Sequence, residues 1–262
     1  MPIKAPDGLR QLNYEEFAAA AYQVMEAVFS VHKEMGRLFD EVVYHKEIAR
    51  RLKDARSEVA VEVSFGTFRK IYYLDLLFAG GALFEFKTVE VLTDYHRAQL
   101  LHYLLLLDLL HGKLVNMRPE AIEHEFVNAA LTREDRIQFT VNDANYMRIN
   151  HANPDVRDLF VPILRDWGTG LDISLYEEAL THFLGGEQQV VQNVGIFVDG
   201  NQTGNQSLRL AGPGMALKIS ALGQGQKRYE GHLRRFLAHT SLECMQWINV
   251  GRKVVTFKTL KR

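Results

Sequence analysis

The sequence repeats itself at an offset of 132 or 133 residues, and this repeat limits what the chain can fold into. Four blocks match in the same order. They are, first copy before second, GRLFDEVVY at 36–44 with GTGLDISLY at 168–176, AGGALFEFK at 79–87 with AGPGMALKIS at 211–220, HRAQLLHYL at 96–104 with YEGHLRRFL at 229–237, and KLVNM at 113–117 with QWINV at 246–250. The repeat predicts two tandem copies of one fold. The alternative is a single domain with coincidental similarity, because apolar patterns recur readily.

Each copy shows the order helix, helix, three strands, helix, two strands. In the first copy the expected helices are 14–35, 40–53 and 94–110, and the expected strands are 59–65, 69–78, 82–89, 111–117 and 122–128. This order predicts an α/β fold with a mixed central sheet flanked by helices. We expect one domain over 1–145 and a second over 146–262, joined by the Asn-rich stretch 142–155.

Composition limits the cellular compartment and the binding partners that the chain is expected to have. The 262 residues include one cysteine, Cys244, so an intrachain disulfide is excluded and a reducing cytoplasm is expected. No stretch resembles a signal peptide or a membrane span. The net charge of −1 does not indicate a nucleic-acid binder, but from Thr203 to Arg262 eleven Lys and Arg oppose two Glu. That bias predicts a basic surface for phosphate, unless the charges are spread over several faces.

Charged residues interrupt the otherwise apolar segment YLDLLFAGGALFEFK at 73–87, which we interpret as two strands joined at Gly80–Gly81. Asp75 lies on the first strand, and Glu85 and Lys87 lie on the second. Buried charge is unfavourable unless it is paired or bound to a cation. The run therefore predicts either a divalent metal site or, as the alternative, a structural salt bridge.

The second copy lacks this polar set while it keeps the apolar framework. Glu41 is replaced by Ile173, Glu85 by Lys218, Lys87 by Ser220 and Gln99 by His232, and Asp75 falls opposite Ser207 or Leu208. Loss of the whole set together indicates that these residues work together. We expect one site per chain, in the first copy only.

The chemistry that suits this set is phosphodiester hydrolysis. Mg²⁺ (or Mn²⁺) prefers oxygen ligands and usually takes one or two protein carboxylates. Asp75 and Glu85, with the backbone carbonyl of Phe86, would suffice. Glu85 and Lys87 point the same way, because residues i and i+2 of a strand share a face. Lys87 could position the attacking water, or deprotonate it if its pKa were lowered.

The combination of Asp75 with the Glu-x-Lys of FEFK resembles the PD-(D/E)xK, restriction-endonuclease-like nuclease superfamily. More narrowly, residues 24–128 resemble its GxxExxY family. The blocks that carry this likeness are VHKEMG, Glu41 with Tyr44, LDLL, FEFK and LTDYHRAQLLHYL. The likeness departs at Leu38, where that family's glycine is usual. It implies two tandem nuclease-like domains, the second degenerate.

The resemblance also implies roles. Asp75, Glu85 and Lys87 would form the metal and water site, Glu41 would approach the metal, and Gln99 would orient the lysine region or contact phosphate. His96 and Arg97 would contact phosphate at a helix start. In the second copy we expect Lys227, Arg228, Arg234 and Arg235 to bind nucleic acid. Structural alternatives stay open for Glu41, Gln99, His96 and Arg97.

These observations predict a metal-dependent nuclease, with DNA expected rather than RNA. The second copy would be structural or would hold substrate. The alternative is an inactive nucleic-acid-binding or assembly module that keeps the fold. We expect a homodimer, or a monomer whose two copies are related by pseudo-symmetry, and no membrane partner.

Overall fold

A computed structural model describes residues 3–148 and 155–262, and the chain divides into two compact units between Asp135 and Arg136. The division falls earlier than the expected boundary at 145, because strand β7 (Thr140–Asn145) pairs with β12 (Val254–Lys261) of the second sheet. Of the expected connector, residues 149–154 lie outside the described residues.

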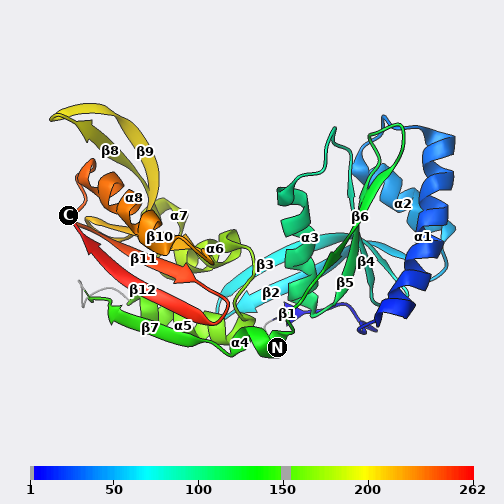
Figure 1. The fold of residues 1–262 in the computed structure, drawn as a ribbon, viewed down its shortest axis with the longest axis horizontal. Helices are drawn as coiled ribbons and strands as arrows, with labels where there is room; N and C mark the ends of the chain where they lie inside the picture. Colours follow the sequence, from blue (N-terminus) through cyan, green and yellow to red (C-terminus); the bar gives the residue numbers. More distant parts are fainter. Residues whose placement is uncertain (1–2, 149–154) are drawn as a thin grey trace. The chain divides into compact units, whose positions relative to one another are not determined.

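The first unit is built on a six-stranded mixed sheet (Figure 1). Its elements are β1 (Ile3–Lys4), α1 (Tyr14–Met35), α2 (Glu41–Arg51), β2 (Arg56–Phe65), β3 (Phe68–Phe78), β4 (Ala82–Lys87), α3 (Asp94–Leu107), β5 (His111–Asn116) and β6 (Glu123–Asn128), with α4 (Arg133–Ile137) at the division. The strands lie in the order β1-β2-β3-β4-β5-β6. All pairs are antiparallel except β4–β5, which is parallel.

Helix α1 begins at a capping box and carries the main core of this unit. Asn13 Oδ1 accepts a hydrogen bond from Glu16 N–H, and Glu16 Oε2 accepts one from Asn13 N–H, which satisfies amide groups at the helix start. Buried residues such as Phe17, Val24 and Val28 pack against Phe84 and other residues of β4 and β5. Figure 1 shows α1 and α2 on one face of the sheet and α3 on the other.

The turn between β3 and β4 brings the two strands of the YLDLLFAGGALFEFK run side by side. Ala79 and Gly80 adopt positive φ angles of 50° and 72°. A Cβ atom at Gly81 would collide with the carbonyl oxygen of Arg10, so glycine is required there. The turn sets the register Leu76↔Phe84 and thereby places Asp75 beside Glu85.

The second unit has its own six-stranded mixed sheet, in the order β7-β12-β11-β10-β9-β8. Its elements after β7 are α5 (Val156–Trp167), α6 (Ile173–Phe183), α7 (Glu187–Val190), β8 (Val191–Val198), β9 (Asn201–Gly212), β10 (Met215–Ser220), α8 (Gln226–Ala238), β11 (Cys244–Val250) and β12. The β10–β11 and β12–β7 pairs are parallel and the others antiparallel. The order and direction from β8 to β12 match those from β2 to β6.

The same side-chain hydrogen bonds recur in both units. Tyr44 OH donates to Gly36 O at 2.7 Å, and Tyr176 OH donates to Gly168 O at 2.5 Å. Asn116 bonds both backbone groups of Val89, and Asn249 bonds both backbone groups of Leu222. The predicted α/β class, with two mixed sheets flanked by helices, is confirmed.

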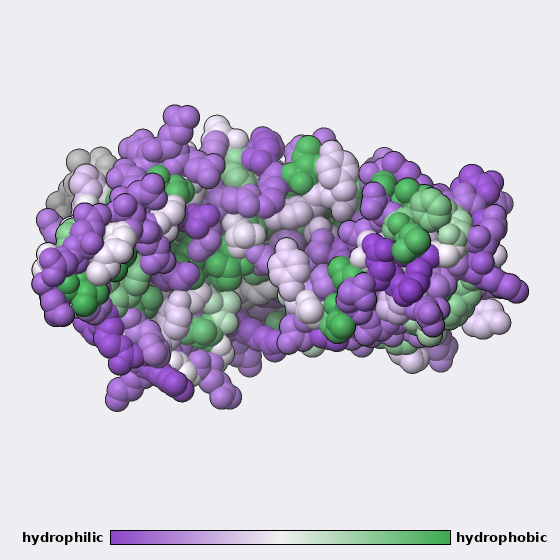
Figure 2. Space-filling view, turned by 90° about the horizontal axis from the view of Figure 1, so that it is seen from above, coloured by the Kyte–Doolittle hydropathy of each residue, from purple (hydrophilic) through white to green (hydrophobic). Residues whose placement is uncertain are grey.

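The length and the polarity of the helices bear on whether any of them could span a membrane. Among the residues described, every helix is too short or too polar to cross a bilayer. The face drawn in Figure 2 is largely hydrophilic, with hydrophobic residues in separate groups.

Candidate functional site

Asp75 and Glu85 meet where β3 and β4 stop pairing. The last paired residues are Leu76 and Phe84, so the next position sets Asp75 opposite Glu85. At this position the Phe86 N–H donates to a side chain, Asp75 Oδ2, at 2.7 Å, and not to a backbone carbonyl of β3. Side chains at opposite positions of neighbouring strands share a face. The two carboxylates are thus brought together, as the sequence predicted.

Lys87 joins this pair to a third carboxylate. Its Nζ lies 2.8 Å from Glu85 Oε1 and 3.4 Å from Glu41 Oε2. Glu41 is the first residue of α2, immediately after the N-cap Asp40. The structure therefore brings Asp75, Glu85, Lys87 and Glu41 into one cluster from three elements.

Burial makes Glu85 the most perturbed acid of the cluster. Only 1% of the residue is exposed. Burial, and then the charge of Asp75, raises the pKa of Glu85 to about 8. Burial also raises the pKa of Asp75, although the hydrogen bond from Phe86 opposes the shift. Two neighbouring carboxyls in an apolar setting resist joint ionisation unless a cation joins them.

Lys87 behaves differently from its carboxylate neighbours. Burial alone would lower its pKa, but the charges of Glu85 and Glu41 and the hydrogen bond to Glu85 raise it above its usual value. Lys87 is therefore a cation in this arrangement. Lys87 would need a lowered pKa to deprotonate water directly, and its neighbours raise the pKa instead.

The donors present fit a hard divalent cation. Glu85 Oε2 is buried and has no hydrogen-bond partner among the described residues, so it is available to a ligand. The N–H and C=O of a strand residue point toward the same neighbouring strand, so the Phe86 carbonyl faces Asp75 as its N–H does. No three Asp, Glu, His or Cys side chains within 3–148 and 155–262 are arranged to hold an ion. Mg²⁺ usually needs only one or two protein carboxylates, because it keeps several waters.

An open cleft of about 430 Å³ gives access to the cluster. Its acidic lining consists of Asp40, Glu41, Glu58 and Asp75, and the remaining lining of Val42, His45, Tyr73 and Thr88. Glu85 and Lys87 are buried and do not line it.

Glu58 was missed by the sequence analysis. The β2–β3 register places it opposite Asp75, its backbone has a positive φ of 52°, and its carboxylate pairs with Lys46 at 2.5 Å. A non-glycine residue with positive φ inside a strand is strained, and such strain often marks functional sites. The signal available in the sequence was a carboxylate immediately before an apolar strand.

His45 also lines the cleft. It is buried, and its Nδ1 has no hydrogen-bond partner within the described part of the chain. Burial lowers the pKa of His45, so its imidazole is held neutral.

Gln99, His96 and Arg97 bond to other residues of the first unit. Gln99 Nε2 donates to Tyr103 OH at 3.2 Å, one turn along α3. His96 Nδ1 accepts from Thr93 N–H at the start of α3. Arg97 pairs with Asp94 and Glu125, each at 2.9 Å. Gln99 thus bonds a residue that senses the cluster, since burial, and then the charges of Glu85 and Asp75, raise the pKa of Tyr103.

The four basic residues expected to bind nucleic acid all lie on α8. Arg234 pairs with Glu230 at 2.8 Å, and Arg235 bonds His232 at 2.8 Å. Lys227 and Arg228 are exposed, and no side-chain bond joins them to any residue that the structure describes. These two are the free cations of the set.

The second unit replaces the whole row of carboxylates. Its registers align Gln192, Leu208 and Lys218 with Glu58, Asp75 and Glu85. Ser220 stands in the place of Lys87 and accepts from Trp247 Nε1. Asp75 therefore corresponds to Leu208, one of the two counterparts that the sequence left open.

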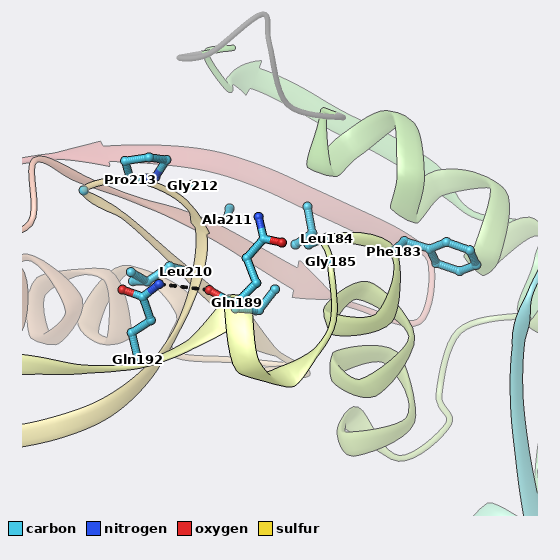
Figure 3. A pocket seen from close by; sticks show the side chains of 11 residues that line it. Phe183, Leu184, Gly185, Gln189, Gln192, Leu210, Ala211, Gly212 and Pro213 are labelled. Carbon is cyan, nitrogen blue, oxygen red and sulfur yellow. Dashed lines mark hydrogen bonds between the residues drawn. The ribbon is translucent and has the colours of Figure 1, made fainter.

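The second unit has a cavity of about 750 Å³ in a different place (Figure 3). It lies between the end of α6, α7 and the turn Gly212–Gly214. No charged side chain lines it, and its polar side chains are Gln189 and Gln192. In the first unit, the corresponding turn is covered by Gly8 and Arg10.

Comparison with known proteins finds one family match. Residues 18–142 match the family model described as the PD-(D/E)XK nuclease superfamily. Among solved structures, the chain titled "Crystal structure of SSO0001" is 20% identical, with a TM-score of 0.28. That match covers 46% of this chain and 60% of the other. No curated protein matches the chain.

Proposed function

We propose that this chain, whose residues 18–142 belong to the PD-(D/E)XK nuclease superfamily, is a metal-dependent nuclease with its active site in the first unit. The observation that carries the proposal is the buried cluster of Asp75, Glu85 and Lys87 with Glu41 beside it. The superfamily match contains all four residues.

Asp75, Glu85 and the Phe86 carbonyl would hold Mg²⁺ or Mn²⁺, with Glu41 in reach directly or through water. The bound metal would neutralise charge on the phosphate and make a water nucleophilic at neutral pH. The raised pKa of Glu85 supports this assignment, because a bound cation would offset the burial and the repulsion from Asp75 that keep the carboxyl protonated.

Lys87 would act as a fixed cation. Its ammonium is held by Glu85 and Glu41, so it can orient a water and offset charge on the phosphate without losing its proton. Gln99 would contribute through Tyr103. His96 and Arg97 would meet phosphate only after exchanging their present partners.

For the second unit we propose a structural or substrate-holding role on a degenerate copy of the same fold. The matching strand order and the recurring tyrosine and asparagine hydrogen bonds support a tandem duplication within the GxxExxY family. Lys227 and Arg228 would contact the backbone of nucleic acid, DNA rather than RNA, with Arg234 and Arg235 beside them. A cytoplasmic location and either a homodimer or a pseudo-symmetric monomer complete the proposal.

The test is Mg²⁺- or Mn²⁺-dependent cleavage of DNA and RNA substrates by the wild type and by Lys87→Ala. Cleavage by the wild type alone is expected. Ser220→Ala is the matched control in the second unit and should cleave as the wild type does. If neither the wild type nor Lys87→Ala cleaves any of a broad set of substrates, but both bind nucleic acid in a salt-sensitive way, the chain is instead a binding module that keeps the nuclease fold.

A further inference from the structure

Apolar side chains border the acidic cleft of the first unit. Tyr73 and Val42 line it, and Phe39 stands immediately before the lining residue Asp40. They are 60%, 37% and 45% exposed. Tyr73 shares a strand face with Asp75, two residues along β3. These three residues are called the apolar rim below.

The second unit serves as an internal control for this rim. At the offsets of the repeat, Tyr73 corresponds to Gln206, Val42 to Ser174 and Phe39 to the buried Leu171. The exposed apolar residues are thus absent from the same unit that lacks the carboxylates. Folding does not require them, since the second unit has the same strand order without them. Exposed apolar groups beside a polar site indicate a binding surface.

Charge argues against a duplex as the occupant of this rim. The cleft lining holds four carboxylates and neither Lys nor Arg. The cations bonded to residues of the lining or the cluster already have partners: Lys46 pairs with Glu58, Lys87 pairs with Glu85 and Glu41, and Arg118 donates to the Thr88 carbonyl. A duplex presents phosphates outward and is bound chiefly through Lys and Arg. An unpaired strand offers base faces as well, and every base can stack on an aromatic ring.

We propose that the apolar rim binds an unpaired base beside the phosphate held at the carboxylate cluster, with the base stacked on Tyr73. The inference rests on the proposed function and deepens it: the substrate class is single-stranded nucleic acid or an unpaired end. Val42 and Phe39 flank the stacked base. Stacking uses the face of the base and not the sugar, so the rim by itself does not distinguish DNA from RNA.

The test is binding of a 2-aminopurine oligonucleotide, single-stranded or annealed into a blunt duplex, to the full-length chain. The protein carries Lys87→Ala, so that substrate survives in Mn²⁺. In this background Tyr73→Ala is compared with Tyr73→Phe, which keeps the ring. Tyr22→Ala is the matched control, because Tyr22 is exposed on α1 and does not line the cleft. The DNA oligonucleotide and its RNA counterpart form two arms.

The expected result is tighter binding of the single strand, with 2-aminopurine fluorescence quenched by stacking. Tyr73→Ala should weaken single-strand binding by roughly 5- to 150-fold and relieve the quenching. Tyr73→Phe and Tyr22→Ala should stay within about two-fold of the parent, because stacking needs only the ring.

Duplex binding as tight as single-strand binding, with no effect of Tyr73→Ala, would overturn the inference. The proposed function is scored separately, by cleavage with wild-type protein. If the protein cleaves duplex, and Lys87→Ala abolishes this cleavage while Tyr73→Ala does not, the proposed function is supported and the role of the rim is rejected. Tyr73-dependent single-strand binding without any cleavage keeps the rim and rejects the nuclease. Absence of binding to every oligonucleotide rejects the rim, and wild-type cleavage alone then decides the nuclease.

Discussion

Neighbouring strands of the first unit carry Glu58, Asp75 and Glu85 side by side, whereas the corresponding strands of the second unit carry Gln192, Leu208 and Lys218. Both units nevertheless keep the same strand order. The fold therefore does not need the carboxylates. Burying them in the first unit raises the pKa of Glu85 to about 8, an unfavourable state that the shared strand order does not require.

The scaffold contacts show the opposite behaviour. The hydroxyls of Tyr44 and Tyr176 each donate a hydrogen bond to a glycine carbonyl in the loop before their helix. Asn116 and Asn249 each hold the segment after the central strand. These bonds recur where the charged row does not, so the bonds belong to the shared scaffold and the charged row does not.

The largest expected effect comes from removing a carboxylate of the first unit. Asp75→Asn should lower cleavage by about 10³-fold, because metal assistance supplies several kcal/mol of transition-state stabilisation. Leu208→Asn, its counterpart in the second unit, should leave the rate within about two-fold. Rates on one substrate in Mg²⁺ measure both. Equal losses from the two variants would show that the units do not differ as described.

The state of Glu85 predicts a pH-dependent difference in stability. Its folded-state pKa of about 8 lies above the ordinary value of 4.5. The neutral carboxyl therefore contributes stability below about pH 4.5, and this contribution is lost as the pH rises toward about 8. Without metal, Glu85→Gln should be more stable than the wild type near pH 9, by a few kcal/mol, and the gap should close near pH 4.5.

Urea unfolding in EDTA across this pH range measures the difference. Ser220→Ala should show no comparable change with pH. Added Mn²⁺ should narrow the gap, since a bound cation stabilises the wild-type carboxylate. Curves for Glu85→Gln and the wild type that run parallel at every pH would mean that Glu85 is not perturbed by burial.

The scaffold asparagines should matter equally in the two units. Asn116→Ala and Asn249→Ala should each lower the free energy of unfolding by about 1–3 kcal/mol, because backbone groups of Val89 and Leu222 lose their partners. Exposed Asn145→Ala should change it by no more than about 0.5 kcal/mol. Denaturant unfolding checks this. A loss confined to one unit would weaken the structural equivalence.

The smallest effect concerns the free cations of α8. Lys227→Ala with Arg228→Ala should weaken single-strand binding and reduce the salt slope by about 0.7 per lost phosphate contact. Arg234→Ala should do less, because its guanidinium already pairs with Glu230. Binding titrated over salt concentration measures the slopes. An unchanged slope for the double variant would remove these residues from the interface.

The sequence predicted those features that depend on local pattern. Helix α1 spans Tyr14–Met35 as expected, because the helical spacing of its apolar residues is a local signal. Asp75 and Glu85 meet because the Gly80–Gly81 turn sets their register. The same-face argument correctly placed Lys87 beside Glu85.

Features that depend on long-range pairing could not be predicted in this way. Glu58 enters the cleft only through the pairing of β2 with β3. Strand β7 joins the second sheet through β12, more than 100 residues later, and this moves the division of the chain. The contact of Lys87 with Glu41 depends on α2 lying beside β4, and no spacing in the sequence encodes that placement.

The central claim is one metal site per chain, in the first unit. A crystal structure of the full chain soaked in Mn²⁺, with anomalous diffraction, tests it most directly. The account predicts an anomalous peak between Asp75 and Glu85, near the Phe86 carbonyl, and none beside Leu208 and Lys218. A peak in the second unit, or none between the two carboxylates of the first, would contradict it.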